Sequence, residues 1–336
     1  MLRRHFLKRA LARYLARYSV FRTDKSATLN SIAFGSCNRT HLSQPLWSHI
    51  KSRQPDIFLW LGDTVYADTT DPEKMRREYQ KQLSMPGYAE LINSTPVYGI
   101  WDDHDYGGNN LGKGNPIKAQ SQQLFLDFIG EPSDSARRAQ QGIYTSYTFG
   151  AAERQVKLIL LDTRYHRERP GKGRAGLLGK AQWRWLENEL KTTTASVNLI
   201  ASSFSVLSTQ IPRAEEWDDY QWEKRRLFRL LKKHKPGGVM FLTGDRHFAA
   251  HLSEKVSGRR YHEIMSSGMT HFLKRSYITR LFKRYYGEQN SYFGINFSVL
   301  DFDWNDPVRI RFCVYDKNNT LQLERSFSLI DGVWSR

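Results

Sequence analysis

The sequence contains few cysteines and no long apolar run. Its two cysteines, Cys37 and Cys313, lie far apart and are too few for a disulfide framework, so the redox compartment stays open. No stretch reaches the roughly 18 consecutive apolar residues that a membrane-spanning helix requires. These two absences exclude a disulfide-stabilised mini-protein and favour a soluble or peripheral globular protein.

Acidic residues are also scarce relative to basic ones. The chain of 336 residues has 51 Lys+Arg against 34 Asp+Glu, which gives a formal net charge of +17. Such an excess favours anionic partners: phosphorylated substrates, an anionic membrane surface or nucleic acid. Because the sequence has no recognisable helix-turn-helix, zinc-finger or base-stacking motif, a specific nucleic-acid partner is not expected. The oligomeric state is not predicted.

Much of this charge lies in a basic N-terminal segment, residues 1–28. The hexapeptide Arg3–Lys8 resembles the core of a twin-arginine export signal, but further arginines interrupt the apolar region that should follow. The alternative is a basic amphipathic helix, with an apolar stripe of Leu11, Tyr14, Leu15 and Tyr18. We favour the helix, and with it a cytoplasmic or peripheral-membrane location over export.

The remainder, residues 29–336, is expected to form one α/β domain, because short apolar runs alternate with helical stretches. The runs that predict strands are Ser31–Phe34, Ile57–Leu61, Val97–Trp101, Val156–Leu161, Leu199–Ser202 and Val239–Leu242. The predicted helices are Pro72–Leu83, Ala119–Ile129, Lys180–Leu190 and Glu215–His234. Residues 297–302, 308–315 and 321–329 predict a β-rich C-terminal tail, and residues 107–115 and 167–179 predict surface loops.

Two of the predicted strands end in the same dipeptide, Gly-Asp. The first ends at Gly62-Asp63 with Tyr66 three residues later, and the second at Gly244-Asp245 with His247 two residues on. Glycine permits a tight turn, and the carboxylate is left at the strand's carboxyl end, where α/β folds bind ligands. One such dipeptide would usually mark an ordinary turn, but two predict a functional site.

Two further strand ends carry groups that bind metals. Trp101 is followed by Asp102, Asp103, His104 and Asp105, and like charges that close repel unless a cation neutralises them. A solvated acidic turn is the alternative. The strand at residues 31–34 ends in Gly35-Ser36-Cys37, and although an isolated cysteine is more often a buried apolar residue, its position matches those of the other three strand ends. We therefore expect metal binding at these ends.

In this order the motifs resemble those of the PhoD-like alkaline phosphatases, a branch of the calcineurin-like metallophosphoesterases. The motifs are Gly-Ser-Cys, Gly-Asp-x-x-Tyr, Trp-Asp-Asp-His-Asp, Leu-Asp-Thr-Arg at 161–164, Gly-Asp-Arg-His and Ser-Ser-Gly at 266–268. The resemblance implies a four-layer αββα sandwich with two or more metal ions between the loop ends of its sheets. Secreted members often carry an extra N-terminal β-domain, for which residues 1–30 are too few.

The resemblance also implies a ligand set. Asp63 would bridge two metals, with Cys37, Tyr66 and His247 completing one site, and Asp103 and Asp245 would be ligands of the second. Thiolate and phenolate suit Fe³⁺ at the first site, whereas oxygen ligands suit Ca²⁺, Mn²⁺ or Mg²⁺ at the second.

Other residues are candidates for contact with the phosphate ester. His104 is placed to orient the phosphoryl group or protonate the leaving oxygen, although a structural histidine bonded to a carboxylate is the alternative. Arg164, and less strongly Arg39, could hold phosphate oxygens, and either could instead be a salt-bridge partner. Asn109 and Asn110 are expected to contact phosphate or complete the second metal site.

Two functions follow as hypotheses. The first is metal-dependent hydrolysis of phosphomonoesters or phosphodiesters, on substrates that include membrane-associated or polyanionic ones. The second is a basic membrane- or polyanion-binding protein that retains only a relic of the site. Residues 273–286 have five basic residues, no acidic one and an apolar repeat every four positions, which predicts a helix that either lies on a membrane or packs on the domain.

Overall fold

The computed structural model describes residues 26–336 apart from 172, 208–214 and 275. The export-signal and amphipathic-helix interpretations of the N-terminus, and the domain boundary at residue 28, therefore rest on residues that lie almost wholly outside the described part. Among the described residues, no helix combines the length and the apolar character that crossing a membrane requires.

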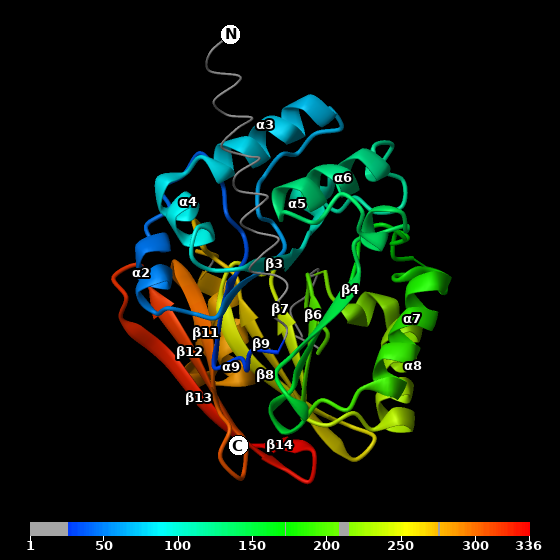
Figure 1. Ribbon diagram of the computed structural model, residues 1–336, viewed down its shortest axis with the longest axis vertical. Helices are drawn as coiled ribbons and strands as arrows, with labels where there is room; N and C mark the ends of the chain where they lie inside the picture. The colour runs from blue at the N-terminus through cyan, green and yellow to red at the C-terminus, as the bar shows by residue number, and fades with distance from the viewer. Residues whose placement is uncertain (1–25, 172, 208–214, 275) are drawn as a thin grey trace.

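The described strands form two seven-stranded sheets that face each other (Figure 1). The first has the order β14-β13-β12-β11-β1-β2-β3, and the second β10-β8-β9-β7-β6-β5-β4. The first contains β1 (Ser31–Gly35), β2 (Ile57–Leu61), β3 (Val97–Ile100), β11 (Asn296–Asp303), β12 (Arg309–Asp316), β13 (Leu321–Ile330) and β14 (Val333–Ser335). The second contains β4 (Thr145–Phe149), β5 (Val156–Leu160), β6 (Val197–Ser202), β7 (Val239–Thr243), β8 (Ala249–Val256), β9 (Arg259–Ser266) and β10 (Ser291–Tyr292).

The central strands β2, β5, β6 and β7 are buried at every position because both of their faces are covered. In β5, Leu158 and Leu160 belong to the cluster between the sheets, while Ile159 packs with the cluster under two outer helices. Those helices are α7 (Gly179–Thr192) and α8 (Gln221–His234), which cover the outer face of the second sheet (Figure 1). The nearly continuous apolar runs in the sequence thus indicate strands that are buried on both faces.

The outer face of the first sheet is covered by α2 (Trp47–Ser52) and α4 (Pro86–Ile92). Trp47 of α2 packs its ring 5.4 Å from Trp60 of β2 and 4.8 Å from Tyr88 of α4. The opposite face of this sheet meets the second sheet, where the rings of Tyr98 and Tyr147 are 4.6 Å apart. The order of layers is therefore helix, sheet, sheet, helix, which confirms the predicted four-layer α/β fold.

Three helices lie near the carboxyl ends of β2 and β3, at the upper end of the view in Figure 1: α3 (Pro72–Leu83), α5 (Asp103–Tyr106) and α6 (Lys118–Phe128). The start of α3 follows a clear sequence signal, since Asp71 caps it by accepting a bond from the Glu73 amide at 2.9 Å and Pro72 occupies the first turn. A last helix, α9 (Ser276–Tyr286), precedes β10.

The β-rich C-terminus is confirmed by β11, β12 and β13, and β11 pairs antiparallel with β1 in the middle of the first sheet. One prediction from the sequence needs correction. The helix expected over residues 215–234 begins at Gln221, because Trp217–Tyr220 form a 3₁₀ turn in which Trp217 and Tyr220 are buried.

A pair of buried histidines lies between the sheets. His251 of β8 and His262 of β9 are 5% and 2% exposed, and Phe327 of β13, in the other sheet, packs against both rings. The Nε2 of His251 lies 3.0 Å from Nδ1 of His262, whose own Nε2 lies 3.2 Å from the carbonyl oxygen of Trp334. One neutral tautomer of each ring satisfies both bonds, with each Nε2 as the donor.

Burial, followed for His251 by the positive charge of the other histidine and of Arg325 and Arg336, lowers the pKa of His251 to about 3. Burial also lowers the pKa of His262 to about 4, against the bond to Trp334, which favours the charged form. A histidine whose folded pKa is lowered binds its proton more readily in the unfolded chain, so stability is lost as pH falls below the unfolded value of about 6.5.

We predict that the free energy of unfolding falls by about 1.4 kcal/mol for each of these two histidines between pH 7.5 and pH 5.5. Replacing His251 with Gln, which keeps an N–H donor but does not titrate, should remove its share of this loss. Urea denaturation at both pH values measures the effect, with His41→Gln at an exposed position as the control. An unchanged pH dependence in His251→Gln would show that the pair does not set acid stability.

Candidate metal centre

The carboxyl ends of four strands converge where the two sheets meet. Cys37 follows β1, Asp63 follows β2, Asp103 opens α5 after β3, and His247 follows β7. The loops touch through the backbone, since the amide of Asn38 donates to the carbonyl oxygen of Asp63 at 2.9 Å. The sequence places these residues at equivalent strand ends, and the fold brings those four strand ends together.

This convergence requires glycine at both Gly-Asp dipeptides. A Cβ atom on Gly62, whose φ is +95°, would lie 2.6 Å from the Cβ of Asp102. A Cβ on Gly244 would lie 2.5 Å from the carbonyl oxygen of Leu61 and 2.6 Å from Oγ of Ser36. Gly244 thus brings the end of β7 against the ends of β1 and β2, across the junction between the sheets.

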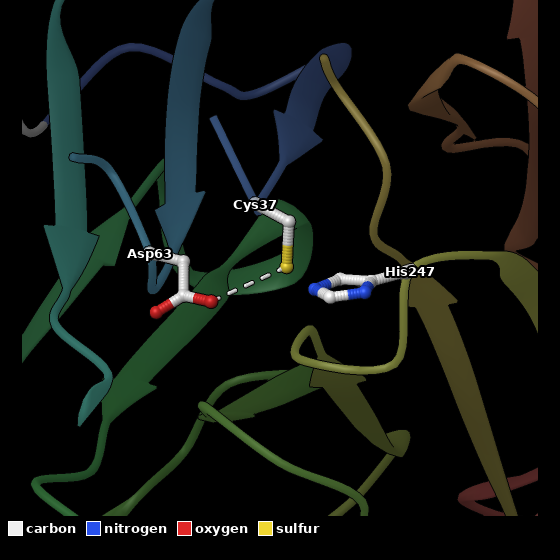
Figure 2. A group of neighbouring side chains, drawn as sticks. All are labelled: Cys37, Asp63 and His247. Carbon is white, nitrogen blue, oxygen red and sulfur yellow. Dashed lines mark hydrogen bonds between the residues drawn. The ribbon is translucent and has the colours of Figure 1, made fainter. Parts of the chain in front are cut away.

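Cys37, Asp63 and His247 form the first group of potential ligands. Their ligand atoms lie within 4.8 Å of one another. Figure 2 shows the three side chains pointing toward a common centre, with the thiol of Cys37 donating to Oδ2 of Asp63 at 3.5 Å. The side chain of Ser267 fixes two of them, because its Oγ lies 3.0 Å from the sulfur of Cys37 and accepts the backbone amide of His247 at 2.8 Å.

Tyr66 joins this group through its hydroxyl. The oxygen lies 2.9 Å from Oδ2 of Asp63 and 3.2 Å from Nε2 of both His247 and His271. The phenol donates its one proton to Asp63, and its oxygen can accept from imidazole N–H groups, so a carboxylate and two imidazoles converge on this hydroxyl. The position of the oxygen fits the predicted role of Tyr66 as a ligand.

Asp63, Asp103 and His104 form a second group, whose ligand atoms also lie within 4.8 Å of one another. Asp63 belongs to both groups, as expected of a bridging ligand. The Oδ2 of Asp103 accepts the backbone amide of Asn110 at 2.6 Å, which holds the following loop against the site. His104 is bonded through Nδ1 to Asp68 at 2.6 Å, and its ring stacks on Tyr66 with centroids 4.1 Å apart.

Several carboxylate oxygens in this centre are buried without a hydrogen-bond partner among the described residues. They are Oδ1 of Asp63, Oδ2 of Asp102 and Oδ1 of Asp103. A buried anionic oxygen without a partner is costly unless it coordinates a cation. The donor set of carboxylates, imidazole, thiol and phenol, together with these oxygens, therefore fits bound metal ions.

The electrostatics point to the same conclusion. Burial and the charges of neighbouring aspartates, Asp103 first, raise the pKa of Asp63 well above its usual value. Burial and then the charges of Asp63 and Asp245 raise the pKa of Cys37 well above the usual value of a thiol. Burial, with Arg39 and His104 nearby, lowers the pKa of His247 to about 4 and keeps its imidazole neutral for coordination. A bound cation would favour the anionic forms of the acids.

The backbone at the site is strained. Cys37, Asp63, Asp245 and His247 have φ values of 61°, 50°, 66° and 60°, in the left-handed region that residues other than glycine rarely adopt. Each costs on the order of 1–2 kcal/mol. Four of the six predicted ligands share this conformation, which aims their side chains into the junction instead of along the sheet surface.

Two predicted site residues need comment. Arg164 is fully buried, and its guanidinium donates to Asp102 at 2.6 Å and to both oxygens of Glu215 at 3.0 and 2.8 Å. Its contacts correspond to the salt-bridge alternative and not to a phosphate-binding role. Asp245 stands at the end of β7 and is half-buried, but its carboxylate belongs to neither group of ligand atoms among the described residues. Its assignment to the second metal stays a prediction.

The other substrate candidates lie at the rim. The guanidinium carbon of half-buried Arg39 is 4.8 Å from the centroid of the Tyr66 ring, and its Nε has no partner among the described residues. Asn109 and Asn110 are exposed and line a pocket of about 770 Å³. All three remain candidates for contact with phosphate.

Four residues of the centre received no individual role from the sequence: Asp68, which holds His104; Asp102; Ser267; and His271. Asp102 accepts Ser203 Oγ at 2.5 Å in addition to Arg164, so its role depends on residues about 60 and 100 positions away. His271 reaches Tyr66 across 205 positions. A local signal existed for Asp68, two positions after Tyr66, for Asp102, within the Trp-Asp-Asp-His-Asp motif, and for Ser267, within the Ser-Ser-Gly motif.

Comparison with known proteins identifies the family. Residues 32–291 match the PhoD-like phosphatase family. The chain belongs to this family. The resemblance that the motifs predicted is thereby confirmed.

Individual relatives of the PhoD-like chain are distant. It is 22% identical over 364 residues to alkaline phosphatase D of Bacillus subtilis (strain 168), across 88% of this chain and 61% of that protein. The chain therefore spans about three fifths of the length of this curated relative.

Solved structures share the fold at low identity. A structure of PhoD superimposes with a TM-score of 0.73 at 18% identity, covering 91% of this chain and 70% of that one. A dimetal phosphatase from Danio rerio gives 0.56 at 12% identity, covering 92% and 100%. A purple acid phosphatase from yellow lupin (Lupinus luteus) gives 0.58 at 10% identity, covering 90% and 54%. At these low identities, the similarity to the three structures shows a shared fold.

We predict that Asp63→Asn weakens the binding of both metal ions by at least about tenfold, because one carboxylate serves both ligand groups. Elemental analysis of the purified protein measures this. Asp303→Asn is the matched control, since Asp303 pairs with Arg309 of β12 two residues beyond Asp301, the partner of the first residue of β1, and so lies at the end opposite the site. Normal metal content in Asp63→Asn would contradict the bridging assignment.

Proposed function

We propose that this PhoD-like protein hydrolyses phosphomonoesters or phosphodiesters with two or more bound metal ions. The observation that carries the proposal is the pair of ligand groups that share Asp63, buried at the junction of the two sheets. Bound metals would activate a water molecule for attack on phosphorus and offset the charge of the phosphoryl oxygens. No protein nucleophile is then required.

Ligand chemistry suggests different metals for the two groups. Cys37, Tyr66, His247 and Asp63 would hold Fe³⁺, because the anionic, electron-rich thiolate and phenolate suit a strongly Lewis-acidic trivalent ion. Asp63 and Asp103 supply oxygen only, which suits Ca²⁺, Mn²⁺ or Mg²⁺. Asp245, at the end of β7, would complete this second set.

His104 and Arg39 would act on the ester. The bond to Asp68 occupies Nδ1 of His104 and fixes the ring, which leaves Nε2 as the nitrogen that can donate a proton to the departing oxygen. Arg39 would hold non-bridging oxygens through its guanidinium fork, whose Nε has no partner among the described residues. Arg164 would instead hold Asp102 in place, and its charge acts against burial, which raises the pKa of that carboxyl.

The contacts disfavour the alternative of a binding protein with a relic site. A relic would be free to lose its strained residues, yet Cys37, Asp63 and His247 all keep left-handed backbone and the two groups still share Asp63. In α9, Phe282 is buried with its ring 4.6 Å from that of Phe248, which supports a helix packed on the domain, with exposed Arg280 and Arg284 on its surface. A membrane-associated substrate stays a prediction from the sequence.

We predict that the metal-loaded protein hydrolyses p-nitrophenyl phosphate or its bis-ester, and that His104→Ala lowers kcat by about 100-fold while leaving the metal content unchanged. A group that donates a proton in the transition state affects the rate more than assembly of the site. His49→Ala, in α2, is the control. Parallel loss of metal and rate would make His104 a ligand, and no hydrolysis of any ester by the wild type would refute the proposed function.

We predict that the purified protein has a visible charge-transfer band that fades on reduction, because electron-rich phenolate and thiolate ligands transfer charge to Fe³⁺. Tyr66→Phe should shift or weaken the band, whereas Tyr315→Phe, on β12, should not. A colourless protein with two zinc ions would refute iron but leave the hydrolysis proposal standing.

A further inference from the structure

A second pocket adjoins the one beside the metal centre. It has a volume of about 510 Å³ and is lined by Gly171, Gly173, Arg174 and Ala175 on one side and by the start of α8 on the other. The two pockets adjoin, since Asp219 lines both and the consecutive residues Pro170 and Gly171 line one each; together they are called the groove. Its near end is tied to the metal centre, since Asn110, in the wall of the first pocket, donates its amide to Asp103.

The far end of this groove is rich in arginine. Arg174 and Arg225 line it, and the indole of Trp222 is 37% exposed there. The guanidinium carbons of Arg174 and Arg229 lie 4.1 and 5.1 Å from the centroid of the Trp222 ring. A guanidinium stacked on an indole keeps its N–H groups available at its edge, so the ring orients the cations without neutralising them.

The charge of these arginines is not balanced locally. Among the described residues, no salt bridge joins Arg174, Arg225 or Arg229 to a carboxylate, and Asp219 is the acidic residue that lines this pocket. Neighbouring lysines of the same helix are paired, Lys224 with Asp218 at 2.8 Å and Lys233 with Glu187 at 2.7 Å. The arginines around Trp222 therefore remain available to an anion, whereas Lys224 and Lys233 are already paired.

We propose that this arginine cluster (Arg174, Arg225 and Arg229 around Trp222) binds a phosphate group of the substrate other than the one that is hydrolysed. The substrate class that it selects is a flexible phosphodiester chain, which lies along the groove and presents one phosphate to the metal centre. Planar guanidinium forks suit phosphate oxygens, and a repeating anion can occupy both ends of a groove at once. Phosphate binding at the cluster does not depend on the proposed function. The presentation of another phosphate to the metal centre for hydrolysis does rest on it.

Binding can be measured separately from hydrolysis. The probe is a fluorescein-labelled dodecamer of abasic deoxyribose phosphodiesters, which carries repeated phosphates and no bases. Its Kd for the metal-loaded full chain is measured by fluorescence anisotropy over a series of salt concentrations, and gel electrophoresis confirms that the probe is intact. Hydrolysis of p-nitrophenyl phosphate, which is too small to reach the cluster, reports the metal centre.

The double variant Arg174→Gln/Arg225→Gln should raise the Kd of the probe about tenfold or more. It should reduce the slope of log Kd against log salt by about 1.4, or about 0.7 for each lost phosphate contact. Its kcat/KM for p-nitrophenyl phosphate should stay within about twofold of the wild type. The matched control is Arg226→Gln, whose guanidinium stacks on Trp183 at 4.6 Å from the same helix but does not line the groove.

Other outcomes overturn the proposal. An unchanged Kd and salt slope in the double variant, or an equal loss in Arg226→Gln, would show that the cluster is only a solvated basic surface. If a labelled dodecamer of deoxythymidylate binds about tenfold more tightly and Trp222→Ala abolishes that difference, the indole stacks on bases and the partner is nucleic acid. Binding of the abasic probe without any ester hydrolysis would leave the cluster assignment intact and refute the proposed function.

Discussion

The close approach of four strand ends is the constraint on which the rest of the structure depends. Gly62 and Gly244 lack the Cβ atoms that would collide with Asp102 and Leu61, so β2, β3 and β7 can end beside one another across two sheets. This approach places several carboxylates in a site with little water, where their mutual repulsion is weakly screened. Without cations, this arrangement of carboxylates costs free energy, and the same arrangement favours the binding of cations.

Strain and burial at this centre have to be offset elsewhere. Left-handed backbone at four positions costs on the order of 1–2 kcal/mol each. The offset comes from the apolar layers: strands such as β5 and β7 are buried on both faces, one between the sheets and the other beneath α7 and α8. A rigid four-layer scaffold can therefore hold ligands in conformations that an isolated loop would abandon.

Elements whose signals lie within a few residues could be predicted from the sequence, whereas features that depend on residues distant in the sequence could not. The bounds of β2 and α3 were predicted correctly, since an apolar run ending in Gly-Asp and an Asp-Pro cap are signals within a few residues. The strands β8 and β9 were missed because β8 becomes exposed along its second half, where polar residues interrupt the apolar pattern. The salt bridges of Arg164 could not be predicted, since its partners Asp102 and Glu215 lie 62 and 51 positions away in the sequence.

Arg164 also links the two halves of the functional surface. It is buried between Asp102, beside the metal ligands, and Glu215, which pairs with Arg167 in the wall of the pocket. Replacing Arg164 would leave the buried carboxylate of Asp102 without a counterion and would remove one of the two arginines that pair with Glu215, so both sides would be affected. The basic residues behind the net charge of +17 therefore serve two purposes. Some, such as Arg164, pair with carboxylates beside the anionic centre. Others, such as Arg39 and the arginine cluster, have no carboxylate partner among the described residues. Cations of the second kind would favour the approach of an anionic ester to this anionic ligand set.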